Sequence, residues 1–140
     1  MPKKIFFDAN VIIDLLHADN DLNRPTKYLF SRLKKNKDAF YCSPTTFAIT
    51  YYFLNKIIRN NQLLNQEIIS FFSEFNFTRE DNVIMEKVKT SGFKDLEDAL
   101  QYYSALDSRV SLIITNNYFD FIPSKIPVYH PLQYINQFLI

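Results

Sequence analysis

Residues 6–14 read FFDANVIID and decide how the chain begins to fold. The apolar run that ends at Phe7 shows no alternation with polar residues, which is typical of a strand covered on both faces. Apolar residues resume at Val11 and predict a short helix over residues 10–17. A buried strand has no use for a carboxylate at its end. Asp8 therefore indicates a metal ligand, a phosphoryl acceptor or a helix cap.

Beyond this stretch the sequence alternates further strands and helices. The residue types predict strands over 3–7, 39–42, 76–78, 111–114 and 126–129. They predict helices over 22–35, from Ser43 and Pro44 to about 54, over 61–75, from a cap at Thr78 or Asp81 to about 88, over 95–107, and from Pro131 onward. This order predicts an α/β fold, a three-layer α/β/α sandwich with a mostly parallel central sheet. Residues 1–140 are expected to form a single domain.

Composition excludes several classes of protein. With 47% apolar residues in a chain of 140, a sizeable core is expected rather than disorder. The one glycine, Gly92, cannot build a glycine-rich phosphate loop, which excludes Walker-type and dinucleotide-binding fingerprints. The net charge of +1 excludes neither a nucleic-acid partner nor a small substrate, because only a local patch of charge bears on that question. No secretory leader is recognised, and no apolar run approaches the roughly 18 residues that a membrane span needs.

The few sulfur and imidazole side chains restrict the metal chemistry. Cys42 is alone, so no internal disulfide is possible, and a reducing cytoplasm is the expected location. With only His17 and His130 beside it, a Cys/His zinc site is not expected. A metal in this protein must be held by carboxylates, which favours Mg²⁺ or Mn²⁺.

Acidic and amide side chains follow the predicted strands at one edge of the sheet. In open parallel sheets, the binding groove lies beyond the carboxyl ends of the strands. The first strand delivers Asp8 there, and the strand over 111–114 delivers Thr115, Asn116 and Asn117, with Asp120 one turn later. These side chains are expected to converge.

The helix over 95–107 adds a second acidic group. Its first turn carries Asp95, Glu97 and Asp98. The simplest explanation is structural: these acids cap the helix and interact favourably with the positive end of its dipole. Asp98, however, lies beside the predicted buried stripe, whose members are Leu96, Ala99, Leu100, Tyr103 and Ala105. A carboxylate near a core face needs a partner. A divalent cation shared with Asp8 would satisfy both groups.

Four motifs in order resemble the PIN domain, the nuclease fold of VapC-type toxins. The motifs are IFFDANVIIDLL (5–16), CSPTTFAITYYFLNK (42–56), FKDLEDALQYYSAL (93–106) and LIITNNYFDF (112–121). The resemblance covers nearly the whole chain. It implies a metal-dependent ribonuclease that hydrolyses RNA phosphodiester bonds with Mg²⁺ or Mn²⁺, as the toxin of a toxin–antitoxin module.

The resemblance also implies roles for single residues. Asp8 and Asp98 take the metal-ligating positions, with Glu97 as a further ligand and catalytic group and Asn117 on the catalytic closing motif. Asn10, Thr115 and Asn116 take substrate-positioning places, as does Asp14, which is also an alternative ligand. Asp120 matches the Asp-Phe pair of the closing motif, which is more often structural.

Two departures from the family pattern leave an alternative open. Many members carry a Glu on the helix after Ser43, where this chain has Ala48-Ile49-Thr50, and many carry Asp in place of Asn117. A catalytically weak or inactive RNA-binding or partner-binding module of the same fold is therefore the second interpretation. A phosphotransferase of the haloacid-dehalogenase type is a third, although Asn10 stands where that chemistry needs an acid.

Partners are expected from the resemblance and the surface residues. The resemblance implies RNA, a cognate antitoxin and a homodimer formed through residues 47–54, with no membrane association. Candidate phosphate contacts are Lys3, Lys4, Arg24, Lys27, Lys56 and Arg59. Tyr51, Tyr52, Tyr102 and Tyr103 are expected in core or dimer packing.

Overall fold

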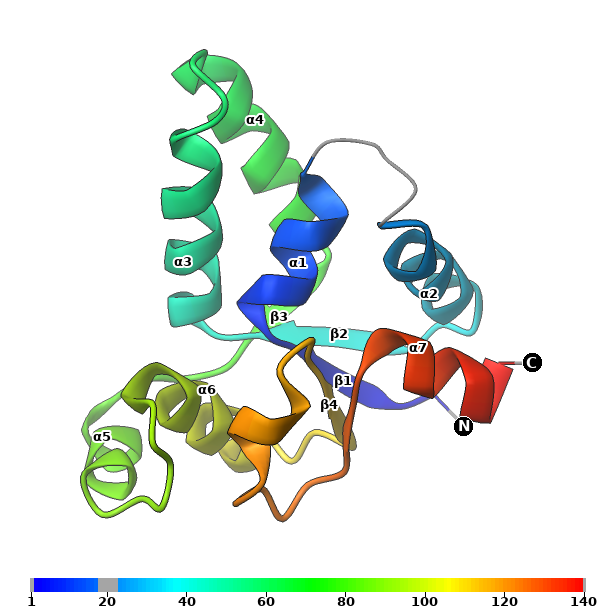
Figure 1. Cartoon of the computed structure of the whole chain (residues 1–140). Helices are drawn as coiled ribbons and strands as arrows, with labels where there is room; N and C mark the ends of the chain where they lie inside the picture. The colour runs from blue at the N-terminus through cyan, green and yellow to red at the C-terminus, as the bar shows by residue number, and fades with distance from the viewer. Residues whose placement is uncertain (1, 18–22, 140) are drawn as a thin grey trace.

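A computed structural model describes residues 2–17 and 23–139 of the chain, and its centre is a parallel sheet (Figure 1). The strands are β1 (Lys4–Phe7), β2 (Ala39–Cys42), β3 (Phe75–Phe77), β4 (Leu112–Ile114) and β5 (Val128–Tyr129). Their order is β3-β2-β1-β4-β5, and every neighbouring pair is parallel. β1 is the central strand, so Asp8, the residue directly after it, lies at the middle of the sheet edge.

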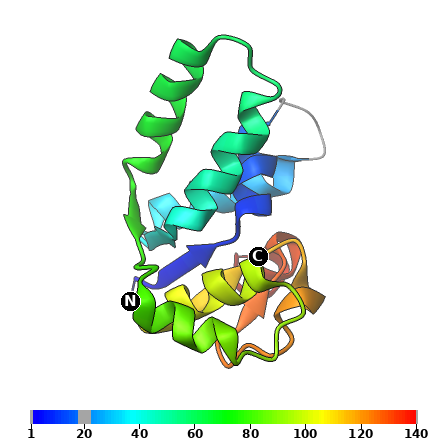
Figure 2. The same cartoon turned by 90° about the vertical axis from the view of Figure 1, so that its left-hand side faces the viewer.

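Helices cover both faces and complete the three-layer α/β/α sandwich (Figure 2). One face carries α1 (Ala9–Leu16), α2 (Arg24–Lys35), α3 (Pro44–Asn55), α4 (Asn61–Phe72), α7 (Pro131–Tyr134) and the π-helical η3 (Ile135–Leu139). The other carries α5 (Asn82–Lys89), α6 (Leu96–Asp107) and the 3-10 turn η2 (Tyr118–Phe121). The predicted fold class is confirmed.

The alternating sides of β1 explain why its apolar run is unbroken. Ile5 and Phe7 belong to the core cluster beneath α1–α4 and α7, whereas Phe6 belongs to the cluster beneath α5 and α6. All three residues are fully buried. Two covered faces therefore require apolar side chains at every position.

Caps define where the helices begin. Ser43 and Thr46 form a capping box at α3, with Pro44 as the first helical residue, as the sequence predicts. Of the two caps proposed for α5, Asp81 is the one used, because its Oδ1 accepts from the Ile84 amide at 3.2 Å. Asp95 caps α6 by accepting from the amides of Glu97 at 2.8 Å and Asp98 at 3.2 Å. This cap sets the direction in which the acidic first turn of α6 leaves the loop.

Several boundaries and burial predictions need correction. Leu22, predicted to start the second helix, lies outside the described residues, and α2 begins at Arg24. β3 begins at Phe75, where the sequence predicts that α4 still continues. Leu96 is 65% exposed because it is the first residue of α6 and lies beyond the end of the core cluster. Tyr52, expected in core or dimer packing, is 67% exposed and therefore does not pack in the core, whereas Tyr102 is buried.

Candidate active site

Asp8 connects the sheet to α1 and is the most buried carboxylate of the site. Its amide donates to the carbonyl of Ile114 at 3.0 Å, which joins the ends of β1 and β4. It is only 4% exposed. Burial raises the pKa of its carboxyl, and hydrogen bonds from Thr115 and Gln101 oppose that rise. The group is thus held as a buried acceptor with its donors already in place.

Three side chains fix the Asp8 carboxylate. Thr115 Oγ1 donates to Oδ2 at 2.7 Å, Asn10 Nδ2 donates to the same oxygen at 3.1 Å, and Gln101 Nε2 donates to Oδ1 at 3.2 Å. Donors come from the two segments that follow β1 and β4 and from α6. A buried carboxylate needs such donors to offset the loss of water.

Asp98 reaches the same place from the first turn of α6. Burial raises the pKa of its carboxyl to about 7, and the negative charges of Asp8 and Asp95 add to the effect, followed by those of Asp120 and Glu97. Asp98 therefore lies in an electrostatic field made by acids from three different segments. Neighbouring carboxylates that raise one another's pKa favour a bound cation.

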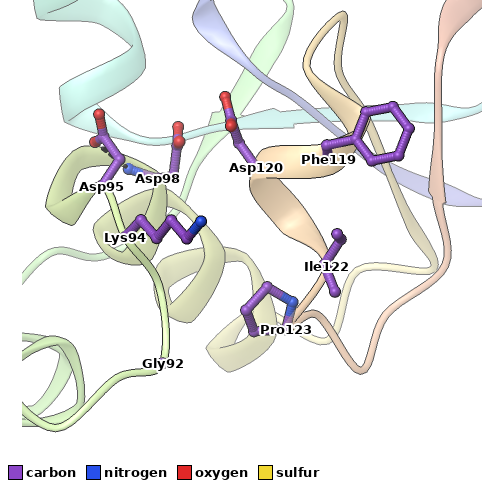
Figure 3. Close-up of a pocket in the computed structure, with 8 residues that line it drawn as sticks. All are labelled: Gly92, Lys94, Asp95, Asp98, Phe119, Asp120, Ile122 and Pro123. Atoms are coloured by element: carbon purple, nitrogen blue, oxygen red, sulfur yellow. Dashed lines mark hydrogen bonds between the residues drawn. The ribbon is translucent and has the colours of Figure 1, made fainter.

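One pocket of about 230 Å³ brings most of the predicted site residues together. The pocket is lined by Asp8, Ala9, Asn10, Ile13, Ile49, Asp95, Glu97, Asp98, Gln101, Asn117 and Asp120; we call it the acidic pocket. Figure 3 shows the carboxylates of Asp95, Asp98 and Asp120 side by side and pointing in one direction. The convergence expected from strand order is present.

The amides of the two motifs tie the closing loop to the start of α1. The Asn116 amide donates to Asn10 Oδ1 at 3.2 Å, and Asn116 Nδ2 donates to the Asn10 carbonyl at 3.5 Å. The Asn117 amide donates to Thr115 Oγ1 at 3.0 Å. Asn10, Thr115 and Asn116 thus hold the loop and the Asp8 carboxylate, while the Asn117 side chain lines the pocket.

Asp14 has different surroundings. Its Oδ2 accepts from Thr26 Oγ1 at 3.0 Å, and its carbonyl accepts from Asn23 Nδ2 at 3.2 Å. It is absent from the lining of the acidic pocket. These contacts connect α1 to α2, which gives Asp14 a structural environment.

Gln101 and Thr46 are the contributors that sequence reasoning missed. Gln101 is 1% exposed, and its Oε1 accepts from Thr46 Oγ1 at 3.0 Å while its Nε2 donates to Asp8. The available signals were an uncharged polar residue inside an otherwise buried helix face and the Thr of the Ser-x-x-Thr motif. Gln101 thereby couples α3, α6 and the end of β1.

Two positions where the resemblance implies an acid lie at the acidic pocket. Ile49, in the stretch where the resemblance implies a Glu, is an apolar residue of the lining. Asn117 lines it with an amide. The pocket therefore has fewer charges than the family pattern implies.

The donor set fits a hard cation that keeps several other ligands. Carboxylate and amide oxygens suit Mg²⁺ and Mn²⁺. Within residues 2–17 and 23–139, no three His, Cys, Asp or Glu side chains are grouped so that they alone could hold a metal ion. Mg²⁺ commonly uses one or two carboxylates and fills its remaining positions with water and phosphate oxygens. A site based on Asp8 and Asp98 agrees with that habit.

The chain is similar to a known ribonuclease and to solved structures that include a toxin–antitoxin complex. Over 118 residues the chain is 28% identical to Ribonuclease VapC1 of Aquifex aeolicus, with 82% of each chain covered. The structure resembles a toxin–antitoxin complex from Klebsiella pneumoniae with 25% identity and a TM-score of 0.61, covering 91% of this chain and 97% of the other. It also resembles VapBC2 from Rickettsia felis bound to a promoter DNA fragment, with 14% identity, a TM-score of 0.68 and coverage of 91% and 98%.

Among the described residues, no helix has the length and apolar character required to cross a bilayer.

The family match spans the described site. Residues 4–118 match the family model of the PIN domain, from β1 through the closing loop after β4. The chain therefore belongs to the PIN domain family.

Proposed function

We propose that the protein is an endoribonuclease that depends on Mg²⁺ or Mn²⁺ and serves as the toxin of a toxin–antitoxin pair. One observation carries the proposal: Asp8 and Asp98, ninety positions apart in sequence, line one acidic pocket. The similarity to Ribonuclease VapC1 supports the reaction class. The proposed substrate is RNA, and the proposed place of action is the cytoplasm.

Asp8 and Asp98 would hold the cation, with Glu97 as a further oxygen donor. A bound divalent ion supplies positive charge against the phosphate and activates water for attack. Thr115, Gln101 and Asn10 keep the Asp8 carboxylate in one orientation, as their hydrogen bonds show. Such orientation matters because a hard cation tolerates little misplacement of its few protein ligands.

The remaining polar groups suit the handling of water and phosphate. Asn117 lines the pocket, and its side-chain carboxamide can donate a hydrogen bond to a phosphate oxygen. Glu97 and Asp120 line it as well and can orient the attacking water or accept its proton. All of these groups are fixed to short segments that β1, β4 and the Asp95 cap hold in place.

The basic residues proposed from sequence have to be reconsidered. Lys4 is the first residue of β1, at the opposite end of that strand from Asp8. Lys3 Nζ donates to Tyr134 Oη at 3.3 Å and lies 4.7 Å from the ring centroid of Phe138. Lys56 lies 4.1 Å from the ring centroid of Tyr52. None of these three lines the acidic pocket, so they can contact RNA only at a distance from the reacting phosphate.

A cognate antitoxin and a second copy of the chain are the proposed protein partners. The similar structure from Klebsiella pneumoniae is a toxin–antitoxin complex by its description. Tyr52 and Phe53 on α3, together with Ile57 just after it, are 67%, 40% and 47% exposed. An apolar surface of this kind is suited to association between chains, and residues 47–54 remain the proposed dimer contact.

Ile49 and Asn117 favour the second candidate, a PIN-fold module that binds RNA or a partner with little or no turnover. Two fewer charges weaken the attraction for a cation. The phosphotransferase interpretation loses its support, because the chain belongs to the PIN family and Asn10 donates to Asp8 where an acid would be needed.

An RNA cleavage assay with Mg²⁺ or Mn²⁺ tests the proposal. Wild-type protein is expected to cleave, and Asp8→Asn and Asp98→Asn to lose activity by at least about 100-fold, because each removes a charged ligand of the proposed cation. Glu86→Gln is the matched control, since Glu86 is an exposed acid on α5 that pairs with Lys89. Full activity in either Asn variant contradicts the proposal, and RNA binding without cleavage by wild type favours the second candidate.

A further inference from the structure

A second pocket of about 430 Å³ adjoins the acidic pocket (Figure 3). Its lining residues are Gly92, Lys94, Asp95, Asp98, Phe119, Asp120, Ile122 and Pro123. It shares Asp95, Asp98 and Asp120 with the acidic pocket. Its volume lies in the range of about 300–1,000 Å³ that is usual for ligand sites. A polymer bound across the acidic pocket would place a neighbouring unit here.

Apolar side chains form the outer wall of this second pocket. Phe119 is 79% exposed and Ile122 is 67% exposed. Phe121, between them in sequence, is buried and packs against Phe93 at 5.9 Å between ring centroids. The neighbouring Tyr118 ring meets Phe119 edge to face, at 5.6 Å and 85°. The buried Phe121 therefore anchors η2, and Phe119 is presented to solvent with one edge supported.

Lys94 supplies the positive charge. Its ammonium forms no ion pair with any residue in the described part of the chain. Figure 3 shows its side chain extending across the opening between Asp98 and Pro123. Among the residues that line either pocket, Lys94 is the basic one. An unpaired cation beside clustered acids suits a phosphate that passes from one pocket to the next.

We propose that the second pocket binds one unpaired nucleotide of the RNA, adjacent to the phosphate that is cut. The base packs on Phe119 and Ile122, and Lys94 contacts the backbone phosphate. Single-stranded nucleic acids are bound by this combination of cationic groups and aromatic faces. The proposal deepens the proposed function and rests on it for the identity of the ligand. It predicts preference for single-stranded over paired RNA, because a paired base cannot leave its stack without cost.

The first test measures binding of a short fluorescein-labelled single-stranded RNA by fluorescence anisotropy. Ca²⁺ replaces Mg²⁺, and gels confirm that the RNA stays intact. Phe119→Ala is expected to weaken binding by about 10-fold, the lower part of the range for base–aromatic stacking, while Phe119→Tyr retains it. Tyr28→Ala removes another exposed aromatic side chain, one that lines neither pocket, and should change nothing.

Lys94 is tested in the same assay. Lys94→Ala should weaken binding and reduce its dependence on salt, since one phosphate contact is lost. Lys87→Ala, at an exposed basic residue of α5, is the matched control. Double-stranded RNA of the same sequence should bind Phe119→Ala and wild type equally, because its paired bases stay in their stack.

A cycle that combines protein and RNA changes assigns the contact to one base. An abasic nucleotide is placed at each position next to the cleavage site. At one position it should weaken wild-type binding as much as Phe119→Ala does, and the two changes together should cost no more than either alone. Additive losses at every position, or equal binding by wild type and Phe119→Ala, overturn the base pocket.

The outcomes separate the base pocket from the proposed reaction. Cleavage by wild type with no effect of Phe119→Ala or Lys94→Ala on binding overturns the pocket and leaves the nuclease intact. Absence of cleavage by wild type, with binding that depends on Phe119 and Lys94, supports the pocket and overturns the nuclease. If the second pocket instead accepts a protein segment, RNA binding is unchanged in both variants, which also overturns the base pocket.

Discussion

Gln101 Nε2 donates a hydrogen bond of 3.2 Å to Asp8 Oδ1, which joins the middle of α6 to the end of β1. The same carboxamide accepts from Thr46 Oγ1 at 3.0 Å. Gln101 is buried, and its two contacts span three elements. The proposed catalytic carboxylate is thereby positioned by a residue that itself does not titrate.

Replacement of Gln101 tests this positioning role. Gln101→Leu should lower the free energy of unfolding by about 1–3 kcal/mol, because buried groups of Asp8 and Thr46 lose a partner. Thermal denaturation measures this loss. Thr46→Val removes the distal hydrogen bond but keeps Gln101 beside Asp8. It should therefore retain more RNA cleavage than Gln101→Leu does, and equal cleavage in the two variants would argue against positioning by Gln101.

The raised pKa of Asp98 predicts how stability depends on pH without metal. Its carboxyl has a pKa of about 7 in the folded chain, against an ordinary value of 3.8. The folded state therefore binds more protons than the unfolded state between these values, and the free energy of unfolding falls as pH rises from 4 to 7. Melting temperatures in EDTA should decline over that range, with a smaller decline in Asp98→Asn. Asp8, whose pKa is also raised, contributes to the decline that remains in Asp98→Asn. An identical decline in both proteins would contradict the assignment.

Mn²⁺ should oppose this loss of stability at higher pH. Cation binding requires ionised carboxylates, so its affinity rises with pH as Asp98 loses its proton. The increase in melting temperature on adding Mn²⁺ should therefore be larger at pH 8 than at pH 6. A shift that does not depend on pH would place the ion away from Asp98.

Ile49 offers a gain-of-function test. Ile49→Glu adds a carboxylate to the lining of the acidic pocket and should strengthen Mn²⁺ binding by about tenfold, since the number of charged ligands sets cation affinity. The metal-free protein should melt at a lower temperature, because the new acid faces Asp8 and Asp98. Ala48→Glu is the matched control, at an exposed neighbour outside the pocket. If Ile49→Glu and Ala48→Glu change Mn²⁺ affinity and the metal-free melting temperature equally, Ile49 is not the position where an added acid reaches the cation.

Local chemistry made much of the fold predictable. The uninterrupted apolar run before Asp8 marks a central strand, and Ser43 followed by Pro44 marks the start of α3, both as found. Strand order then places Asp8 and Asn117 at the same sheet edge without further information. Helix ends were less predictable, because the end of α4 and the start of β3 depend on how Phe72 and Phe75 pack in one core cluster.

The parts of the site that escaped prediction depend on tertiary contacts. Gln101 has no charge to mark it, and its role appears only when α3 and β1 come together around it. Lys94 lies in the 93–106 motif but has no role assigned there, and its place in the second pocket depends on how η2 folds back toward α6. Leu96 was expected in the core from helical spacing alone, but spacing does not say where the covering layer ends.

Calorimetric titration with Mn²⁺ tests most directly whether Asp8 and Asp98 hold one cation. Wild-type protein and Glu86→Gln are expected to bind with the same affinity. Asp8→Asn and Asp98→Asn should each lose most of that binding while retaining a cooperative melt. If both Asn variants bind Mn²⁺ with wild-type affinity, the two carboxylates do not share a cation.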